Sequence, residues 1–275
     1  MAVLGLGAGG YWYLHHGDLV ADARYRMSRG DLRGAEIDLN SFLRNHPHNP
    51  EASYRLGLVN LAHDNPVAAE RNLKIARDAG YDPKLVIMPL GEAYLRQRRF
   101  DDALTDFTIE KAPLAAKAQV LSVRAMAYLS LQRFAEARQA IGDAIAAAPN
   151  DPEPKLVAGR IELAAGDDNA AGARAEQVLA QDPKRAEALL LKAELAMRRG
   201  DPNAALATAQ TVLAGNPDRP DAKMAAARAL GALHRDIEAT KLVDDVLKRT
   251  PRDRQLSARG AGGCGSTISP PRKRR

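Results

Sequence analysis

Small, apolar positions recur between polar ones along this chain with a period of 34 residues. One column contains only alanine, at Ala35, Ala69, Ala103, Ala137, Ala171, Ala205 and Ala239. A second column lies twelve residues earlier and contains only alanine or glycine, at Ala23, Gly57, Gly91, Ala125, Gly159, Ala193 and Ala227. Two helices cross closely only where their side chains are small. The two columns therefore predict an array of paired helices, one pair for each period.

The unit at residues 118–151 displays the pattern most clearly. Leu121, Ala125 and Tyr128 are four and three residues apart, so they lie on one face of a predicted first helix. A similar spacing begins again at Phe134, on a predicted second helix. Pro149 closes the unit, because proline removes a helical donor and disfavours helix in the residue before it.

This unit resembles the tetratricopeptide repeat, in which a small residue is followed by an aromatic one, an alanine, an apolar residue and a closing proline. The resemblance covers roughly residues 18–251. It implies an all-α fold, a right-handed superhelical solenoid of about seven helix-turn-helix repeats. It also implies a role in protein–protein binding, but it names no partner, because function depends on sites carried by a fold.

The predicted turns share one chemistry, a glycine followed by an aspartate, at Gly30-Asp31, Gly166-Asp167 and Gly200-Asp201. Glycine suits a left-handed residue after a helix, and aspartate accepts hydrogen bonds from the first N–H groups of the next helix. The closing prolines are irregular, since Pro83 and Pro113 are 30 residues apart and the other steps are 34 or 36. We therefore expect a lengthened second helix in repeat two and a shortened one in repeat three. Pro89 predicts a kink or a late start in the first helix of repeat three.

Charge divides the chain into segments, which we take as residues 1–17, 18–251 and 252–275. The whole net charge of +6 lies in residues 251–275, which hold seven basic residues against Asp253 alone. We expect residues 252–275 to be disordered, because they lack apolar periodicity. The repeats are neutral overall, and we expect no nucleic acid partner for them, because phosphate binding needs clustered positive charge. The abrupt change of composition leads us to expect a truncation or a shifted reading frame there.

Residues 2–14 are uncharged and mostly apolar. Thirteen residues are too few to span a bilayer, which takes about 20. Tyr11, Trp12 and Tyr13 lie where an aromatic belt would meet the membrane surface. We interpret residues 1–17 as the end of a membrane anchor or signal segment whose charged beginning precedes this sequence. The alternative is an apolar segment that packs on the first repeat.

The sequence offers little for catalysis. It has no glycine-rich phosphate loop, no serine nucleophile elbow and no zinc spacing. Cys264 is the only cysteine, so no intrachain disulfide can form. His46 and His48 could share a metal, but no third ligand accompanies them. We therefore expect no catalytic residue, no metal and no cofactor.

Tetratricopeptide proteins bind an extended or helical peptide in a groove that the first helices line. Matching this sequence to that pattern gives a candidate groove, which consists of Tyr54, Leu58, Met88, Glu92, Arg96, Met126, Leu129, Leu156, Arg160, Leu190, Glu194 and Arg198. The groove is apolar with scattered charges, and flexible Met and Leu side chains suit adaptable binding. The alternative is that these residues only pack against the next helix. Arg24, Leu58 and Glu92 include no asparagine, which argues against the clamp that holds chaperone C-termini.

We therefore expect a non-catalytic scaffold that binds a protein or peptide. Stretches such as residues 90–104, LGEAYLRQRRFDDAL, resemble bacterial periplasmic or membrane-anchored tetratricopeptide proteins of exopolysaccharide and PEP-CTERM exosortase systems. The resemblance implies the bacterial cell envelope, with the cytoplasm as the alternative. Two other hypotheses stay open: a repeat arm of a larger enzyme such as a glycosyltransferase, and nucleic acid binding through the arginine-rich tail.

Overall fold

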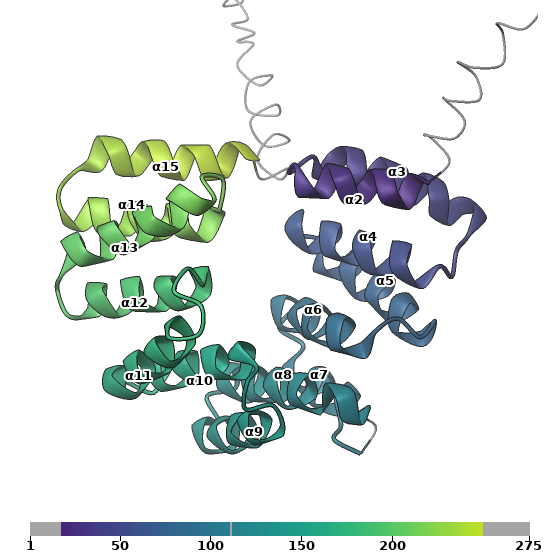
Figure 1. Cartoon of the computed structure of the whole chain (residues 1–275), viewed down its shortest axis with the longest axis horizontal. Coiled ribbons are helices and arrows are strands. Elements are labelled where there is room, and N and C mark those ends of the chain that lie inside the picture. The colour runs from purple at the N-terminus through teal and green to yellow at the C-terminus, as the bar shows by residue number, and fades with distance from the viewer. Residues whose placement is uncertain (1–17, 111, 250–275) are drawn as a thin grey trace, which may run out of the picture. The chain divides into compact units, whose positions relative to one another are not determined.

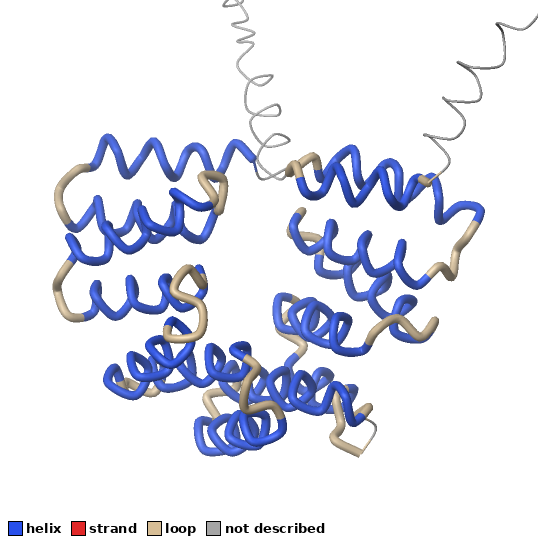
Figure 2. Tube along the Cα trace, viewed as in Figure 1, coloured by secondary structure: helices blue, strands red, loops and turns tan. Residues whose placement is uncertain are grey.

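A computed structural model describes residues 18–110 and 112–249 (Figure 1), so the expectations for residues 1–17 and 252–275 lie outside it. The described residues form fourteen α-helices and no strand (Figure 2), which confirms the all-α fold. The helices are α2 (Leu19–Ser28), α3 (Leu32–Asn45), α4 (Pro50–Ala62), α5 (Pro66–Asp78), α6 (Pro83–Arg96), α7 (Phe100–Asp106), α8 (Lys117–Ser130), α9 (Phe134–Ala147), α10 (Pro152–Ala164), α11 (Asp168–Leu179), α12 (Ala186–Arg198), α13 (Pro202–Gly215), α14 (Pro220–Ala232) and α15 (Asp236–Arg249). A short 3₁₀ helix, η1 (Leu114–Ala116), precedes α8.

In chain order the helices make seven pairs, each joined by a short turn, as the 34-residue period predicts. The residues fall into two compact units that divide between Leu191 and Lys192, inside α12. Within the first unit each first helix contacts the next one, from α2 to α4, α6, α8 and α10. Figure 1 shows these helices following one another in chain order. In the second unit α14 packs against both α13 and α15.

The two columns of small residues lie where the helices pack. All seven members of the column that starts at Ala23 are buried, and so are the first six of the alanine column. The last alanine, Ala239, is half-buried. One buried cluster joins Leu73, Leu90 and Val123, which come from three successive repeats. The inferred role of the small positions is therefore confirmed.

The glycines of the column permit the closest approaches. A Cβ atom added at Gly91 in α6 would lie 2.4 Å from Val123 Cγ2 in α8. One added at Gly159 in α10 would lie 2.6 Å from Leu191 Cδ2 in α12. Both distances are too short for carbon atoms, so even alanine overfills these crossings. Val123 cannot turn away easily, because a β-branched side chain in a helix has one strongly preferred rotamer.

The turns repeat the same backbone conformation in all seven pairs. One residue in each turn has a positive φ, and these residues follow the 34-residue period: Gly30, Asp64, Arg98, Gln132, Gly166, Gly200 and His234. The three glycines confirm the expected left-handed turn. Asp31, Asp167 and Asp201 also cap the following helices as predicted, each accepting a backbone N–H bond of 2.9 Å.

Repeat three departs from the others, as the proline spacing predicts. Its second helix, α7, has seven residues, whereas α9 and α13 have fourteen. By the period, Glu110 stands where α9 and α11 bury Ala144 and Val178, and Glu110 is exposed. A charged residue cannot replace a buried apolar one there without a partner, so the helix ends early.

One expectation for this region was wrong, and one of the two alternatives for Pro89 is excluded. The second helix of repeat two is not lengthened, since α5 has 13 residues and the extra residues form a turn in which Gly80 has φ +80°. The first helix of repeat three does not start late at Pro89, because α6 begins at Pro83 and continues through Pro89.

Gly91→Ala tests the close crossing. The added methyl should lower the free energy of unfolding by about 1–3 kcal/mol, although alanine is the better helix former. Gly142→Ala is the matched control, because no atom lies within 4 Å of the Cβ it would add in α9, so it should stabilise the chain by up to about 1 kcal/mol. Unfolding followed by circular dichroism measures both. An equal increase in the free energy of unfolding for both variants would contradict the steric limit assigned to Gly91.

Candidate functional site

A cleft lies over the beginnings of three successive first helices, α6, α8 and α10. This groove cleft has a volume of about 200 Å³ and is lined by Lys84, Leu85, Met88, Gln119, Ser122, Asp151, Glu153 and Pro154. Leu85, Gln119 and Glu153 are 34 residues apart, and so are Met88 and Ser122. Three repeats therefore present equivalent positions to one cleft.

A second hollow adjoins the groove cleft. This edge chamber has a volume of about 380 Å³, shares Lys84, Gln119 and Asp151 with the cleft, and is otherwise lined by Leu114, Ala115, Ala118, Ala147 and Ala148. Leu114 and Ala115 belong to η1, which lies in the connection that follows the short α7. The irregularity of repeat three therefore forms one wall of the chamber. Leu114 is 91% exposed.

The two carboxylates of the cleft already have partners. Asp151 caps α10 by accepting the Glu153 N–H at 3.0 Å, and its other oxygen accepts from Gln119 Nε2 at 3.3 Å. Glu153 forms an ion pair with Arg185. Burial raises the pKa of Glu153, while the Arg185 charge opposes that rise. The Lys84 ammonium, in contrast, has no hydrogen bond or ion pair within residues 18–110 and 112–249.

Of the candidate groove residues, Met88 lines the groove cleft. Tyr54, Leu58, Met126, Leu129 and Leu190 are half-buried. The Tyr54 ring stacks on Tyr81 with centroids 4.7 Å apart, which occupies one of its faces.

Leu156 requires a correction. It is 3% exposed and belongs to a buried cluster with Val178 and Ala188. It therefore packs between helices instead of facing a partner, which is the alternative that spacing alone left open.

The charged candidates are all exposed. Glu92 pairs with Arg96 at 2.6 Å, and Arg96 also donates to the Leu61 carbonyl oxygen at 2.9 Å. Arg96 thus ties α6 to the end of α4. Arg160 lies on α10, and Glu194 and Arg198 lie on the part of α12 that belongs to the second unit.

Sequence reasoning missed the residues at the ends of the helices, above all Lys84, Gln119 and Asp151. All three lie at or just before the start of a first helix, at nearly the same position of the 34-residue period. The period could therefore have indicated that they lie close together. Ala147 and Ala148, at the end of α9, gave no signal, because the chamber that they line depends on the course of η1.

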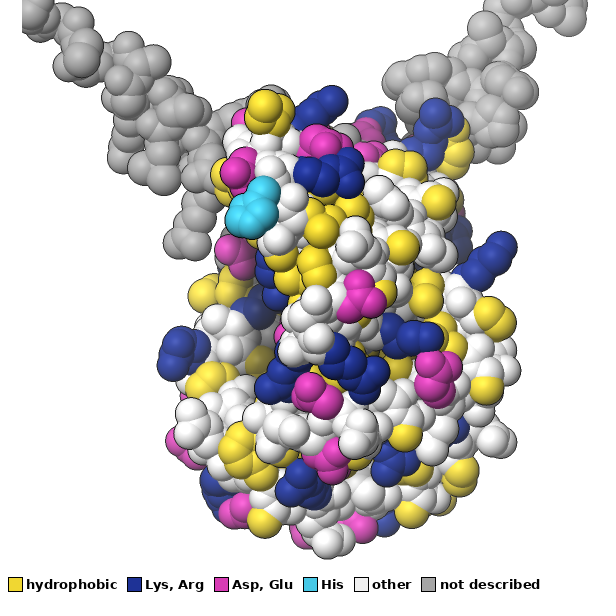
Figure 3. All heavy atoms as spheres, turned by 90° about the vertical axis from the view of Figure 1, so that its left-hand side faces the viewer, with side chains coloured by type: hydrophobic (Ala, Val, Ile, Leu, Met, Phe, Trp, Pro, Cys, Tyr) yellow, Lys and Arg dark blue, Asp and Glu magenta, His cyan; other side chains and the backbone are white. Residues whose placement is uncertain are grey.

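Charge alone does not single out a surface. On the face drawn in Figure 3, Lys and Arg side chains are interspersed with Asp and Glu. In the described ranges, no three His, Cys, Asp or Glu side chains gather closely enough to hold a metal ion. None of the helices found there combines the length and apolar character that crossing a membrane requires.

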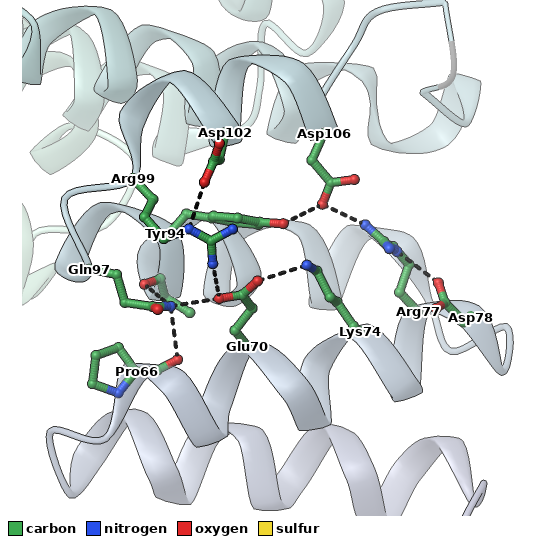
Figure 4. A network of polar contacts seen from close by, with 11 residues as sticks. Pro66, Glu70, Lys74, Arg77, Asp78, Tyr94, Gln97, Arg99, Asp102 and Asp106 are labelled. Carbon is green, nitrogen blue, oxygen red and sulfur yellow. Dashed lines mark hydrogen bonds and ion pairs between the residues drawn. The ribbon is translucent and has the colours of Figure 1, made fainter.

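A polar network joins repeats two and three beneath Tyr94 (Figure 4). Glu70 of α5 is 8% exposed and accepts hydrogen bonds of 2.7 Å from Lys74, Gln97 and Arg99. The Tyr94 hydroxyl donates to Asp106 of α7 at 2.9 Å. Arg77 of α5 reaches the same oxygen of Asp106 at 3.0 Å.

The network holds the short α7 in place. Lys74 and Arg99 lie 5.0 and 4.9 Å from the centre of the Tyr94 ring, distances at which cations are attracted to an aromatic face. Burial raises the pKa of Glu70, but the hydrogen bonds from Lys74 and Gln97 and the nearby positive charges outweigh it, so the pKa lies below its ordinary value. Every charge in the network has a partner, which is typical of a structural tie.

Comparison with known proteins identifies the family of the chain. Two family models, both described as the tetratricopeptide repeat, match residues 20–83 and 88–152, and residues 162–229 and 196–259. The chain is similar to a crystal structure of a tetratricopeptide repeat protein from Parabacteroides merdae, with a TM-score of 0.57 and 16% identity over 88% of this chain and 96% of that one.

The chain is also similar to a chain in the crystal structure of the APC/C hetero-tetramer Cut9–Hcn1, with a TM-score of 0.52 and 15% identity over 89% of this chain and 47% of that one. A search of curated proteins found no match. Identities this low establish the fold alone.

Glu70→Gln tests the tie. Because the folded-state pKa of Glu70 is depressed, its contribution to stability is present above the ordinary pKa of glutamate and is lost as the pH falls through the depressed value. Near pH 7 the variant should be less stable by about 1–2 kcal/mol, allowing for the partial exposure of Lys74 and Arg99. That difference should shrink toward about pH 3 in thermal unfolding.

Glu136→Gln serves as the control, because Glu136 pairs with Arg133 on the surface of α9. Its unfolding midpoint should stay near that of the unchanged chain at both pH values. A Glu70→Gln difference that is absent, or equal at both pH values, would contradict the role assigned to Glu70.

Proposed function

Because the chain belongs to the tetratricopeptide repeat family, we propose that it is a non-catalytic scaffold that binds a protein partner as a peptide in the groove cleft. Tetratricopeptide repeats generally mediate protein–protein interaction, and proteins of this fold are generally non-catalytic. The binding module is the repeat array, which we take as residues 18–251.

One observation carries the proposal: equivalent positions of three first helices line a single cleft. A peptide has a repeating backbone, so it can contact the same position in repeat after repeat. Leu85 is 46% exposed, so the cleft offers an accessible apolar contact that a peptide side chain can cover.

We also propose that the scaffold acts in the bacterial cell envelope, attached through residues 1–17, in envelope or exopolysaccharide assembly. The support is the apolar run at residues 2–14, its aromatic residues, and the likeness of residues 90–104 to such proteins.

Binding in the cleft is tested by panning a random displayed peptide library against the full chain. Met88→Asp places a charge in the cleft and should abolish the enrichment of peptides, because an unpaired carboxylate opposes the burial of apolar side chains. Val67→Asp is the matched control, since Val67 is 65% exposed on α5 and lies outside the cleft. Circular dichroism shows whether both variants are folded. Failure to enrich any peptide, or enrichment that Met88→Asp leaves unchanged, would refute groove binding.

Envelope attachment is tested by expressing the full chain and residues 18–275 in a bacterium and fractionating the cells. Part of the full chain should be in the membrane fraction and the shortened chain should not, because only the full chain carries the apolar, aromatic segment that can associate with a membrane surface, although thirteen residues are too few to span the bilayer. The same distribution for both would contradict attachment through residues 1–17.

A further inference from the structure

The edge chamber is lined in part by Leu114 and Ala115 of η1, which follows the shortened second helix of repeat three. Repeats four, five and six bury Ala144, Val178 and Val212 at the equivalent position. Repeat three has the exposed Glu110 there, and η1 follows in place of helical turns. The position therefore contributes no apolar side chain from the chain itself.

We propose that the edge chamber holds one aliphatic side chain of the bound peptide, and that a carboxylate of the same peptide pairs with Lys84. This inference rests on the proposed function and names the chemistry of the partner. The peptide is then an acidic segment with a leucine-sized side chain, and it leaves the groove cleft over the edge of repeats three and four.

The lining of the chamber supports the aliphatic side chain. Four of its residues are alanines, so their side chains end at Cβ and leave the space beyond unfilled. Leu114 is 91% exposed at the chamber and would lose contact with water when a second apolar side chain covered it. The chamber and the cleft share the polar residues Gln119 and Asp151. Polar groups at this junction suit the polar backbone of a peptide that runs from the cleft into the chamber.

The charges support the carboxylate. The Asp151 carboxylate accepts a hydrogen bond from Gln119, and the Glu153 carboxylate pairs with Arg185. A basic group of a peptide would therefore have to compete with these contacts. Lys84 is exposed and its ammonium has no partner in the described ranges. It lies in the first turn of α6, where the helix dipole adds to its attraction for an anion. Lys84 therefore offers a peptide carboxylate an ammonium whose donors are available, beside an Asp151 carboxylate that neutral N–H groups already occupy.

Gln119 has one polar atom that the described residues leave without a donor. Its Nε2 donates to Asp151, which fixes the orientation of the amide, because a carboxylate only accepts. The Oε1 atom is buried and has no hydrogen-bond donor. A peptide N–H that entered the cleft could satisfy it after a small rotation of the amide.

The test is library panning against the full chain and four variants. Ala147→Leu fills the chamber, and Ala146→Leu is its control, since both alanines are exposed on α9 and only Ala147 lines the chamber. Lys84→Glu reverses the charge at this position, and Lys117→Glu is its control, because Lys117 is exposed outside both hollows. Ala115→Leu in η1 is a second way to fill the chamber if Ala147→Leu does not fold.

The unchanged chain and both controls should enrich peptides with Leu, Ile, Val or Met near an Asp or Glu. Ala147→Leu should select Ala or Gly at the aliphatic position and bind a synthetic leucine peptide about tenfold more weakly by fluorescence anisotropy, because the chamber is full. Lys84→Glu should select Lys or Arg in place of the acid.

Two results separate the inference from the proposed function. If Met88→Asp abolishes enrichment but the chamber and Lys84 variants leave the selected motif unchanged, the groove binds peptide and this inference is wrong. If no peptide is enriched by the unchanged chain, both are wrong. A motif without an acidic residue, or one that changes equally in the controls, also overturns the inference.

Discussion

Within the first unit, helices approach one another closely where a glycine or an alanine stands at the point of contact. Gly91 lies so close to Val123 that an added Cβ atom would be 2.4 Å from it. That approach fixes the separation of α6 and α8, and the same arrangement continues to α10. Residues 34 positions apart therefore face one cleft. The distance between the helices at their crossing sets the distance between these residues in the cleft.

Repeat three has a shortened second helix and a polar network that ties this helix to repeat two. Its second helix is short, and the exposed Glu110 stands where other repeats bury an apolar residue. The polar network around Tyr94 joins α7 to α5 through Asp106 and Arg77, which supplies contacts that packing does not. The exposed remainder of the connection then becomes a wall of the edge chamber. The same irregular repeat thus contains both the polar network that stabilises α7 and a wall of the proposed binding surface.

The sequence predicted the features that depend on local rules. The columns at Ala35 and Ala23, the capping by Asp31 and the short helix before Pro113 all follow from side-chain size, capping and proline chemistry. It did not predict the burial of Leu156, since a residue at groove spacing can also face the next helix. The network on Glu70 was equally hidden, because Gln97 and Arg99 lie in the turn between α6 and α7, and only three-dimensional packing brings them to Glu70 of α5.

The left-handed turn position has a consequence for how the array can open. Three repeats place glycine there, while Asp64, Arg98, Gln132 and His234 occupy it in the other four. A side chain at positive φ is strained by about 1–2 kcal/mol, so the four turns store energy that the glycine turns do not. Local fraying should therefore differ from one helix pair to the next, and hydrogen exchange would be fastest beside the strained turns. A regular backbone repeat can in this way carry an uneven distribution of local motion, set residue by residue without any change in the packing of the helices.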